Sequence, residues 1–219
     1  MNSVCKICGK TTTEWSHLRM ASLYYYCSAC EFVSKDETIC LSNSESIAIY
    51  NTHENSINDV RYVAYFKKFI EAAVLPFSNG NKNGLDFGSG PSAVLAQVLT
   101  RDYGYDMDIY DLYYAPEKNY IGKKYDLVTS TEVAEHIDFP LAYFRLLKGC
   151  LTEEGNISMK TQFHKNNAFH FSDWHYARDK SHIGFYTEKT MATIAKLVGL
   201  KVVYTNHLDY TTFVIDNGQ

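Results

Sequence analysis

A glycine-rich turn between a short apolar strand and a helix limits this chain to few folds. The run LDFGSGPS spans residues 85–92 and is followed by the helical pattern AVLAQVLT and by a second strand-like run, MDIYD. Strand, tight turn, helix and strand make a βαβ unit, whose two strands are parallel. The sequence therefore predicts an α/β fold in which ligands bind at the carboxyl edge of a parallel sheet.

The remaining hydrophobic pattern continues this alternation. Between residues 46 and 76, apolar residues recur at steps of three and four, which predicts one amphipathic helix. Further elements are expected after residue 120, with strands at 124–131, 156–161, 200–205 and 211–216 and helices at 139–150 and 187–198.

The charge balance gives no general affinity for nucleic acid. Asp and Glu number 25 against 21 Lys and Arg, for a formal net charge of −4. The N-terminal run MNSVCKICGK places charge and cysteine where a secretion signal needs an apolar stretch, and no segment reaches the roughly 20 apolar residues of a membrane span. We therefore expect a cytoplasmic protein that does not enter a membrane and has a small-molecule partner. The sequence does not indicate an oligomeric state.

Two CxxC pairs stand near the N-terminus. Cys5 and Cys8 form the first, and Cys27 and Cys30 form the second after 18 intervening residues. This spacing is typical of a four-thiolate zinc site, in which each pair presents two sulfurs to one tetrahedral ion. A redox dithiol needs only one such pair and is the weaker interpretation. The predicted zinc ion has no open position, so it stabilises the fold and does not catalyse.

Two cofactors compete for the glycine turn. Gly88, Gly90 and Ala93 fit the dinucleotide fingerprint GxGxxA, in which the glycines allow close backbone approach. Asp86 favours a different ligand, because a carboxylate two residues before the first glycine repels a pyrophosphate and attracts a sulfonium or ammonium cation. Asp111 ends the second strand, 21 residues after Gly90, where it can accept hydrogen bonds from ribose hydroxyls. S-adenosylmethionine fits both carboxylates.

With YDLVTSTEVAEHI at residues 125–137, these motifs resemble the first, second and fourth-strand motifs of class I S-adenosylmethionine-dependent methyltransferases. The resemblance covers about residues 84–215, and the CxxC pairs are similar to those of bacterial methyltransferases with an N-terminal zinc ribbon. It implies a Rossmann-like seven-stranded sheet of order 3-2-1-4-5-7-6 whose last strand is antiparallel. We expect a zinc-ribbon module at 1–45, a helical connector over the cofactor at 46–80 and a methyltransferase domain at 81–219.

The resemblance also implies where the cofactor binds. The glycine turn would hold its methionine end, the carboxylate after the second strand its ribose, and the next residue would pack on the adenine. Tyr50 and His53, ahead of the long helix, are expected near the methionine moiety, and the alternative is that they cap the helix. The expected cofactor-binding residues are Asp86, Gly88, Ser89, Gly90, Asp111, Leu112, Thr131, Glu132, Tyr50 and His53.

Two features depart from the family pattern. Ser92 stands where the turn usually has a third glycine, a position that mainly serves helix packing. Only 14 residues separate Asp111 from Asp126, so the second helix and third strand must be shortened or replaced. No carboxylate for the adenine amino group is assigned in this segment.

Histidines gather around the expected acceptor site. His136 follows the fourth strand and is either a general base or a residue that caps and orients the next helix. His175 and His182, with Trp174 and Tyr176, lie in a long segment that resembles the stretch closing over the acceptor pocket in zinc-ribbon methyltransferases. We predict His136, His175 and His182 as catalytic candidates, and a packed aromatic lid is the alternative. Histidine spacings in this segment match no helical ligand pair, so no second metal site is expected there.

The predicted function is S-adenosylmethionine-dependent methyl transfer to a small acceptor, with O-, N- or C-methylation left open. Because this reaction is an in-line displacement, the protein supplies mainly alignment and, for a hydroxyl acceptor, a base. The alternatives are a non-catalytic regulatory or scaffold protein that binds the cofactor, and an RNA methyltransferase, since zinc ribbons precede the fold in some ribosomal RNA guanine methyltransferases. Asp86 and the run TEVAEH argue against an NAD-dependent oxidoreductase.

Overall fold

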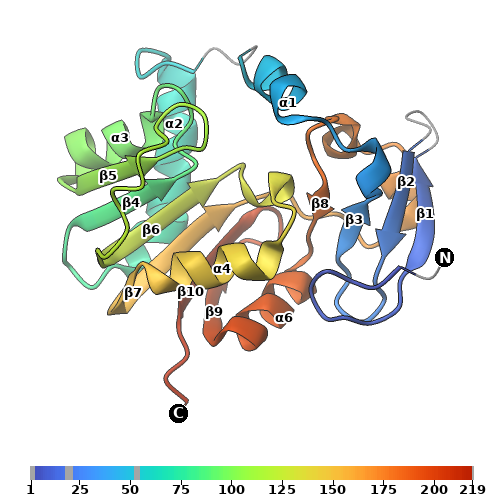
Figure 1. Cartoon of the computed structure of the whole chain (residues 1–219). Coiled ribbons are helices and arrows are strands. Elements are labelled where there is room, and N and C mark those ends of the chain that lie inside the picture. The colour runs from blue at the N-terminus through green and yellow to red at the C-terminus, as the bar shows by residue number, and fades with distance from the viewer. Residues whose placement is uncertain (1–2, 18–21, 52–54, 219) are drawn as a thin grey trace.

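The computed structural model describes residues 3–17, 22–51 and 55–218. A large sheet with helices on both faces lies beside a small sheet built mainly from the N-terminal part of the chain (Figure 1). Within the described residues, every helix is too short or too polar to cross a membrane.

The large sheet has the strand order β5-β4-β6-β7-β10-β9. Its strands are β4 (Asn83–Phe87), β5 (Asp106–Tyr110), β6 (Tyr125–Thr131), β7 (Leu151–Lys160), β9 (Leu200–Thr205) and β10 (Tyr210–Ile215). The first four are parallel to one another, whereas β10 is antiparallel to both of its neighbours. The expected terminal hairpin is confirmed, and the carboxyl ends of β4, β5 and β6 meet at one edge.

The sheet has six strands in the described part of the chain rather than the seven expected. β5 and β6 are joined by residues 111–124, which turn back through a bridge between Asp111 and Ala115 and form neither a helix nor a further strand of this sheet. A crossover helix with an additional strand needs more residues than this segment has. The family order 3-2-1-4-5-7-6 is therefore observed without its first member, and β5 is an edge strand.

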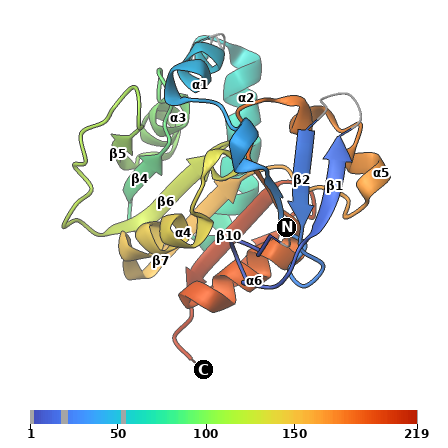
Figure 2. The ribbon, with the colours of Figure 1, turned by 45° about the vertical axis from the view of Figure 1, so that its right-hand side comes forward.

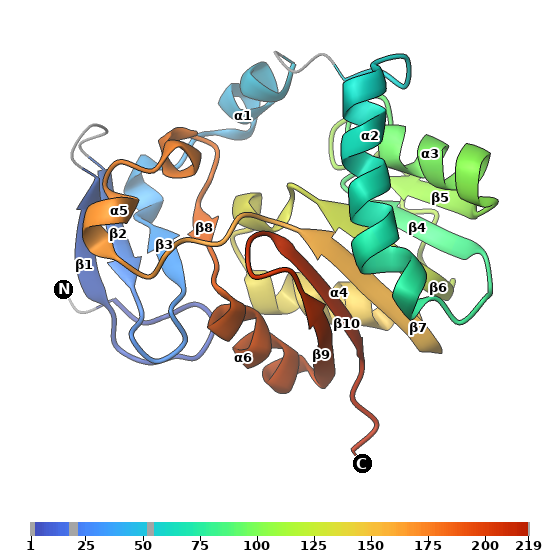
Figure 3. The ribbon, with the colours of Figure 1, turned by 180° about the vertical axis from the view of Figure 1, so that it is seen from behind.

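Helices cover both faces of the large sheet (Figures 1 and 3). One face carries α2 and α3, and the other carries α4 and α6. Each face has its own apolar cluster, in which Phe69 of α2 and Phe144 of α4 are fully buried. The bounds are α2 (Val60–Phe69), α3 (Val94–Tyr103), α4 (Pro140–Gly149) and α6 (Glu188–Val198).

The single helix expected over 46–76 is wrong, because this part of the chain forms separate helices. The first, α1 (Asn43–Tyr50), lies apart from α2. Asp59 begins α2 by accepting hydrogen bonds from two amides of its first turn, and an aspartate in this position favours a new helix start. After α2 the chain continues as a π-helical turn, Ile70–Val74, and a 3₁₀ turn, Leu75–Phe77.

The small sheet is antiparallel, with the order β1-β2-β3-β8 (Figure 1). Figure 2 shows β1 and β2 side by side, with α5 next to β1. Its last strand, β8, comes from the segment between β7 and α6, which also contains the short helices α5 and η5. The ring of Tyr24 packs against Phe171 and Phe185 at centroid distances of 5.1 and 5.8 Å. The N-terminal module thus obtains its apolar core from residues far along the chain. The elements are β1 (Thr13–His17), β2 (Ser22–Tyr26), β3 (Val33–Lys35), η1 (Glu37–Ile39), α5 (Ala168–Phe171), η5 (His175–Arg178) and β8 (Gly184–Phe185).

Candidate active site

The glycine turn connects the end of β4 to the end of β5. Gly88 and Gly90 have φ angles of 83° and 68°, which residues with a side chain rarely adopt. A Cβ at Gly88 would lie 2.2 Å from Cγ2 of Val133, so no side chain fits there. The amides of Gly88 and Ser89 donate to the Tyr110 carbonyl oxygen at 2.7 and 3.1 Å. The backbone of the turn is therefore held against the neighbouring strand.

Asp111, directly after β5, is hydrogen-bonded to the same turn. Its Oδ2 accepts a hydrogen bond from the Gly90 amide at 2.9 Å, and its Oδ1 accepts from the amides of Tyr113 and Tyr114 at 2.9 and 3.1 Å. A carboxylate has about four acceptor positions, so three amides leave room for a further hydrogen bond. Leu112, the expected adenine contact, is exposed beside it.

Asp86 points into the protein interior. It is 1% exposed, and its Oδ1 accepts a hydrogen bond from Oγ1 of Thr129 on β6 at 2.8 Å. Burial raises the pKa of Asp86 to about 7, because the charged carboxylate loses its hydration. The expected contact between Asp86 and a cofactor stays a prediction, since its side-chain partner in the structure is Thr129.

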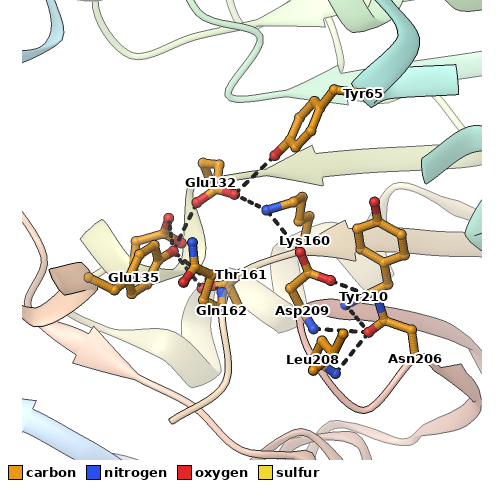
Figure 4. A network of polar contacts seen from close by, with 11 residues as sticks. Tyr65, Glu132, Glu135, Lys160, Thr161, Gln162, Asn206, Leu208, Asp209 and Tyr210 are labelled. Atoms are coloured by element: carbon orange, nitrogen blue, oxygen red, sulfur yellow. Dashed lines mark hydrogen bonds and ion pairs between the residues drawn. The ribbon is translucent and has the colours of Figure 1, made fainter. Parts of the chain in front are cut away.

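Glu132, directly after β6, is the centre of a polar network (Figure 4). Its Oε1 accepts a hydrogen bond from the Tyr65 hydroxyl at 3.3 Å and pairs with the Lys160 ammonium. Its Oε2 accepts from the Tyr176 hydroxyl at 2.9 Å. The Lys160 side chain is 4% exposed, and its Nζ also lies 3.1 Å from Oδ2 of Asp209. Residues from α2, β6, β7 and the β9–β10 turn therefore meet at this point.

The ion pair fixes the charge of this network. Burial favours the neutral form of Glu132, but Lys160 and the hydrogen bonds outweigh it and lower the pKa of the carboxyl below its ordinary value. Burial likewise opposes the charge of Lys160, yet Glu132 raises the pKa of the ammonium well above its usual range. Both groups are ionised at neutral pH. Sequence reasoning missed Lys160, although a lysine ending the apolar strand run NISMK is an available signal.

A second carboxyl, Glu135, lies behind this pair. It is 0% exposed, and its Oε1 contacts the Tyr176 hydroxyl, whose single proton is shared between Glu132 and Glu135. Its Oε2 receives no hydrogen bond from a donor among the described residues, but the carboxyl is hydrogen-bonded to that of Glu132. Burial, and then the negative charge of Glu132, raise the pKa of Glu135 well above its ordinary value. Both effects favour the protonated form of Glu135 over the carboxylate.

The structure brings His136 and His182 together and leaves His175 apart from them. The two imidazole centroids are 4.8 Å apart. Nδ1 of His136 lies 3.1 Å from the Ser181 carbonyl oxygen, and Nδ1 of His182 lies 2.8 Å from that of Tyr176. Burial, and then His182, lower the pKa of His136 to about 4, so its imidazole is neutral at pH 7. His175 is exposed on η5.

Tyr50, at the end of α1, lies against this histidine pair. Its ring centroid is 5.2 Å from that of His136, with the rings nearly perpendicular, and 5.8 Å from that of Tyr113. The helix ahead of α2 therefore reaches both the histidines and the loop after β5. His53, the other residue expected here, lies outside the described residues.

Three further expectations concern residues beside the site. Thr131 ends β6 directly before Glu132 and is half-buried. Trp174 is 9% exposed and packs in the core of the small sheet, which favours the aromatic-lid alternative for this residue. The capping alternative for His136 is not observed, because the structure shows no side-chain hydrogen bond at the N-cap of α4.

The four paired cysteines meet beside the small sheet. Sγ of Cys5 lies 3.5 Å from Sγ of Cys30, and Sγ of Cys8 lies 3.4 Å from Sγ of Cys27. All four sulfurs lie within 4.8 Å of one another. Four thiolates bound to zinc at about 2.3 Å are about 3.8 Å apart in a tetrahedron, so the donor set fits this ion.

Comparison with known proteins shows the family. The sequence pattern of the family described as "Methyltransferase domain" matches residues 60–205, more than half of the chain. The chain therefore belongs to this methyltransferase-domain family. The match begins at α2, so the cysteine module lies outside it. No curated protein matches the sequence.

Solved structures with a similar fold are distant in sequence. The mitomycin 7-O-methyltransferase MmcR has a TM-score of 0.58 and 13% identity, covering 80% of this chain and 58% of its own. An O-methyltransferase family protein from Burkholderia thailandensis has a TM-score of 0.53 and 14% identity. The match covers 74% of this chain and 62% of that protein. LaPhzM has a TM-score of 0.51 and 10% identity, and the match covers 79% of this chain and 59% of LaPhzM. The chain thus matches less than two thirds of the length of these proteins, and the likeness shows the fold alone.

Proposed function

We propose that this protein transfers a methyl group from S-adenosylmethionine to a small-molecule acceptor. The observation that carries this proposal is the hydrogen bond between Gly90 and Asp111, which joins the glycine turn after β4 to the carboxylate after β5. Ligands of open α/β sheets bind at this edge. Membership of the methyltransferase-domain family supports the assignment of the reaction.

The residues around the turn suit a cationic adenosyl cofactor. The bare backbone at Gly88 allows close approach of the methionine end, and Asp111 retains acceptor capacity for a ribose hydroxyl. Exposed Leu112 offers apolar surface to the adenine. Glu132 and Asp209 place two carboxyls around the single ammonium of Lys160, an arrangement that suits a sulfonium or ammonium cation nearby. S-adenosylmethionine supplies the electrophilic methyl group, and the protein holds donor and acceptor in line.

On the acceptor side we place His136 and His182. A neutral imidazole accepts a proton, which suits transfer to a hydroxyl, while N- and C-methylation stay open. The net charge of −4 gives no support to an RNA acceptor. Fold neighbours described as O-methyltransferases are consistent with a small acceptor.

The proposal includes one structural zinc ion held by Cys5, Cys8, Cys27 and Cys30. Three of these cysteines are at most 4% exposed, and a four-sulfur shell leaves no position for substrate. The ion would stabilise the small sheet, on which the 164–187 segment packs. Zinc therefore supports the wall of the acceptor site without entering the reaction.

Calorimetric titration of the full chain with S-adenosylmethionine, S-adenosylhomocysteine and NAD tests the cofactor. The proposal predicts binding of both adenosyl ligands and no binding of NAD. An assay of S-adenosylhomocysteine release with panels of metabolites and RNA then tests the acceptor. Turnover with a metabolite supports the proposal, turnover with RNA alone contradicts the small acceptor, and binding without any turnover supports the regulatory alternative.

A further inference from the structure

We propose that Glu135, His136 and His182 form a second metal site, which takes one divalent transition-metal ion such as Zn²⁺. One ligand atom from each residue lies within 4.8 Å of the other two. Glu135 and His136 belong to the 3₁₀ helix η4 (Ala134–His136), and His182 lies just ahead of β8. The site is separate from the four cysteines and has nitrogen and oxygen ligands in place of sulfur.

The carboxyl of Glu135 provides the first argument. It is completely buried, its Oε1 contacts Tyr176, its Oε2 receives no hydrogen bond from a donor among the described residues, and the carboxyl lies against that of Glu132. Buried polar atoms nearly always have a partner, and a carboxyl oxygen without one is costly. A metal cation within reach of two imidazoles satisfies that oxygen and allows the carboxyl to ionise.

The orientation of both histidines provides an independent argument. Nδ1 of His136 faces the Ser181 carbonyl oxygen, and Nδ1 of His182 faces the Tyr176 carbonyl oxygen. Because a carbonyl oxygen only accepts, each Nδ1 carries the proton and each Nε2 keeps a free lone pair. Metal-binding histidines typically have this arrangement, in which a backbone carbonyl fixes the ring and its tautomer.

The donor set indicates the class of ion. Two imidazole nitrogens and one carboxylate oxygen are a known shell for zinc with a position left open for water or substrate, and they also suit neighbouring transition metals. Ligand atoms at about 2.0–2.2 Å from a tetrahedral ion are about 3.3–3.6 Å apart. Binding therefore requires the three side chains to move together by up to about 1.5 Å from the 4.8 Å limit within which their ligand atoms lie. Asp179 Oδ2, 3.8 Å from Nε2 of His182, adds negative charge beside the site.

Such an ion would connect two parts of the chain. The Ile183 amide already donates to the Glu135 carbonyl oxygen at 2.8 Å, so η4 and the segment leading to β8 are in direct contact. The metal would hold this segment against the carboxyl edge of the large sheet. An ion on both Nε2 atoms would leave neither imidazole free to accept a proton, so this site is an alternative to the base role proposed above for His136 and His182. Ion binding requires neither cofactor nor acceptor, so the titration below succeeds or fails separately from the test of methyl transfer.

The test is a calorimetric titration of Zn²⁺ into full-length protein whose cysteine site already holds one equivalent of zinc. We expect one further saturable equivalent. Binding of Cu²⁺ to the same protein should give an electron paramagnetic resonance spectrum with coupling to two imidazole nitrogens. Absence of a second equivalent at millimolar Zn²⁺ would overturn the proposal.

Variants assign the site. His182→Ala should weaken the second equivalent by at least about 100-fold, since loss of outer contacts alone costs 10- to 100-fold. His175→Ala, at an exposed histidine of the same segment, is the matched control and should bind like the wild type. If His182→Ala fails to fold, Glu135→Gln serves instead, because it keeps the side-chain volume and removes the charge. Unchanged affinity for the second Zn²⁺ in a folded Glu135→Gln or His182→Ala protein contradicts the assignment. An equal loss of this affinity in His175→Ala contradicts it as well.

Discussion

The amide of Gly90 donates a hydrogen bond to Oδ2 of Asp111 at 2.9 Å, although 20 residues separate the two in sequence. The same carboxylate accepts two amides of the loop that follows β5. One side chain therefore organises both loops of the proposed cofactor site. Its loss should affect cofactor binding more than the fold, because the strands themselves pair without it.

Asp111→Asn should weaken S-adenosylmethionine binding by about 1.5 to 3 kcal/mol. The substituted amide group can accept hydrogen bonds through one atom only, so it turns an N–H toward either Gly90 or the loop amides. Calorimetry measures the change. Asp106→Asn, at an exposed aspartate at the start of β5, is the control and should bind with wild-type affinity. Equal affinity of all three proteins would remove Asp111 from the site.

Freshly purified protein should contain at least one equivalent of zinc bound by the cysteines. Cys27→Ser should lose this equivalent and unfold the small sheet at lower temperature, because a bound structural metal contributes folding free energy. Cys40→Ser, outside the cluster, should retain it. Elemental analysis and thermal melting give the two readouts, and full zinc content in Cys27→Ser would contradict the four-cysteine site.

Much of this architecture follows from local sequence pattern. The βαβ unit, the tight turn at Gly88 and Gly90 and the terminal hairpin were predictable, because periodicity and glycine placement are properties of neighbouring residues. The short distance between Asp111 and Asp126 indicated that the third strand must be shortened or replaced, but the expectation of seven strands was wrong for the described part of the chain. The pairing of β8 with β3 could not be predicted from the sequence, because a two-residue strand, Gly184–Phe185, has no periodicity.

The candidate site was predicted less completely than the fold. Sequence motifs indicated Glu132 and His136, but the pairing of Glu132 with Lys160 depends on the register between β6 and β7. The choice between His175 and His182 depends on how a long irregular segment folds back on the large sheet. Hydrophobic patterning carries no information on either point.

Asp86 should give the stability a specific pH dependence. Its pKa is raised by burial from 3.8 to about 7, so the folded protein keeps a proton that the unfolded chain releases. This contribution is fully present below about pH 4 and is lost as pH rises through 7, by up to about 4 kcal/mol. Relative to Asp86→Asn, the wild type should therefore lose stability between pH 4 and 8.

Chemical denaturation of both proteins without ligand measures this difference. Asp106→Asn is again the matched control, and its stability relative to the wild type should change little over the same range. A constant difference between the wild type and Asp86→Asn from pH 4 to 8 would show that Asp86 has an ordinary pKa.

His182→Ala should separate the two halves of the reaction. Because the cofactor is assigned to the turn and Asp111, its affinity should stay within about 0.5 kcal/mol of the wild type. Turnover with a competent acceptor should fall by about 100-fold or more if His182 or the adjacent His136 accepts the proton. Exposed His175→Ala should retain more activity. Loss of cofactor binding in folded His182→Ala would assign this segment to the cofactor instead.

The central claim is that the joined ends of β4 and β5 bind an adenosyl methyl donor. Its most direct test is calorimetric titration of the wild type and Asp111→Asn with S-adenosylmethionine. We expect saturable binding of one equivalent to the wild type and binding weaker by about 1.5 to 3 kcal/mol in the variant. A folded wild-type protein that shows no binding of S-adenosylmethionine would contradict it.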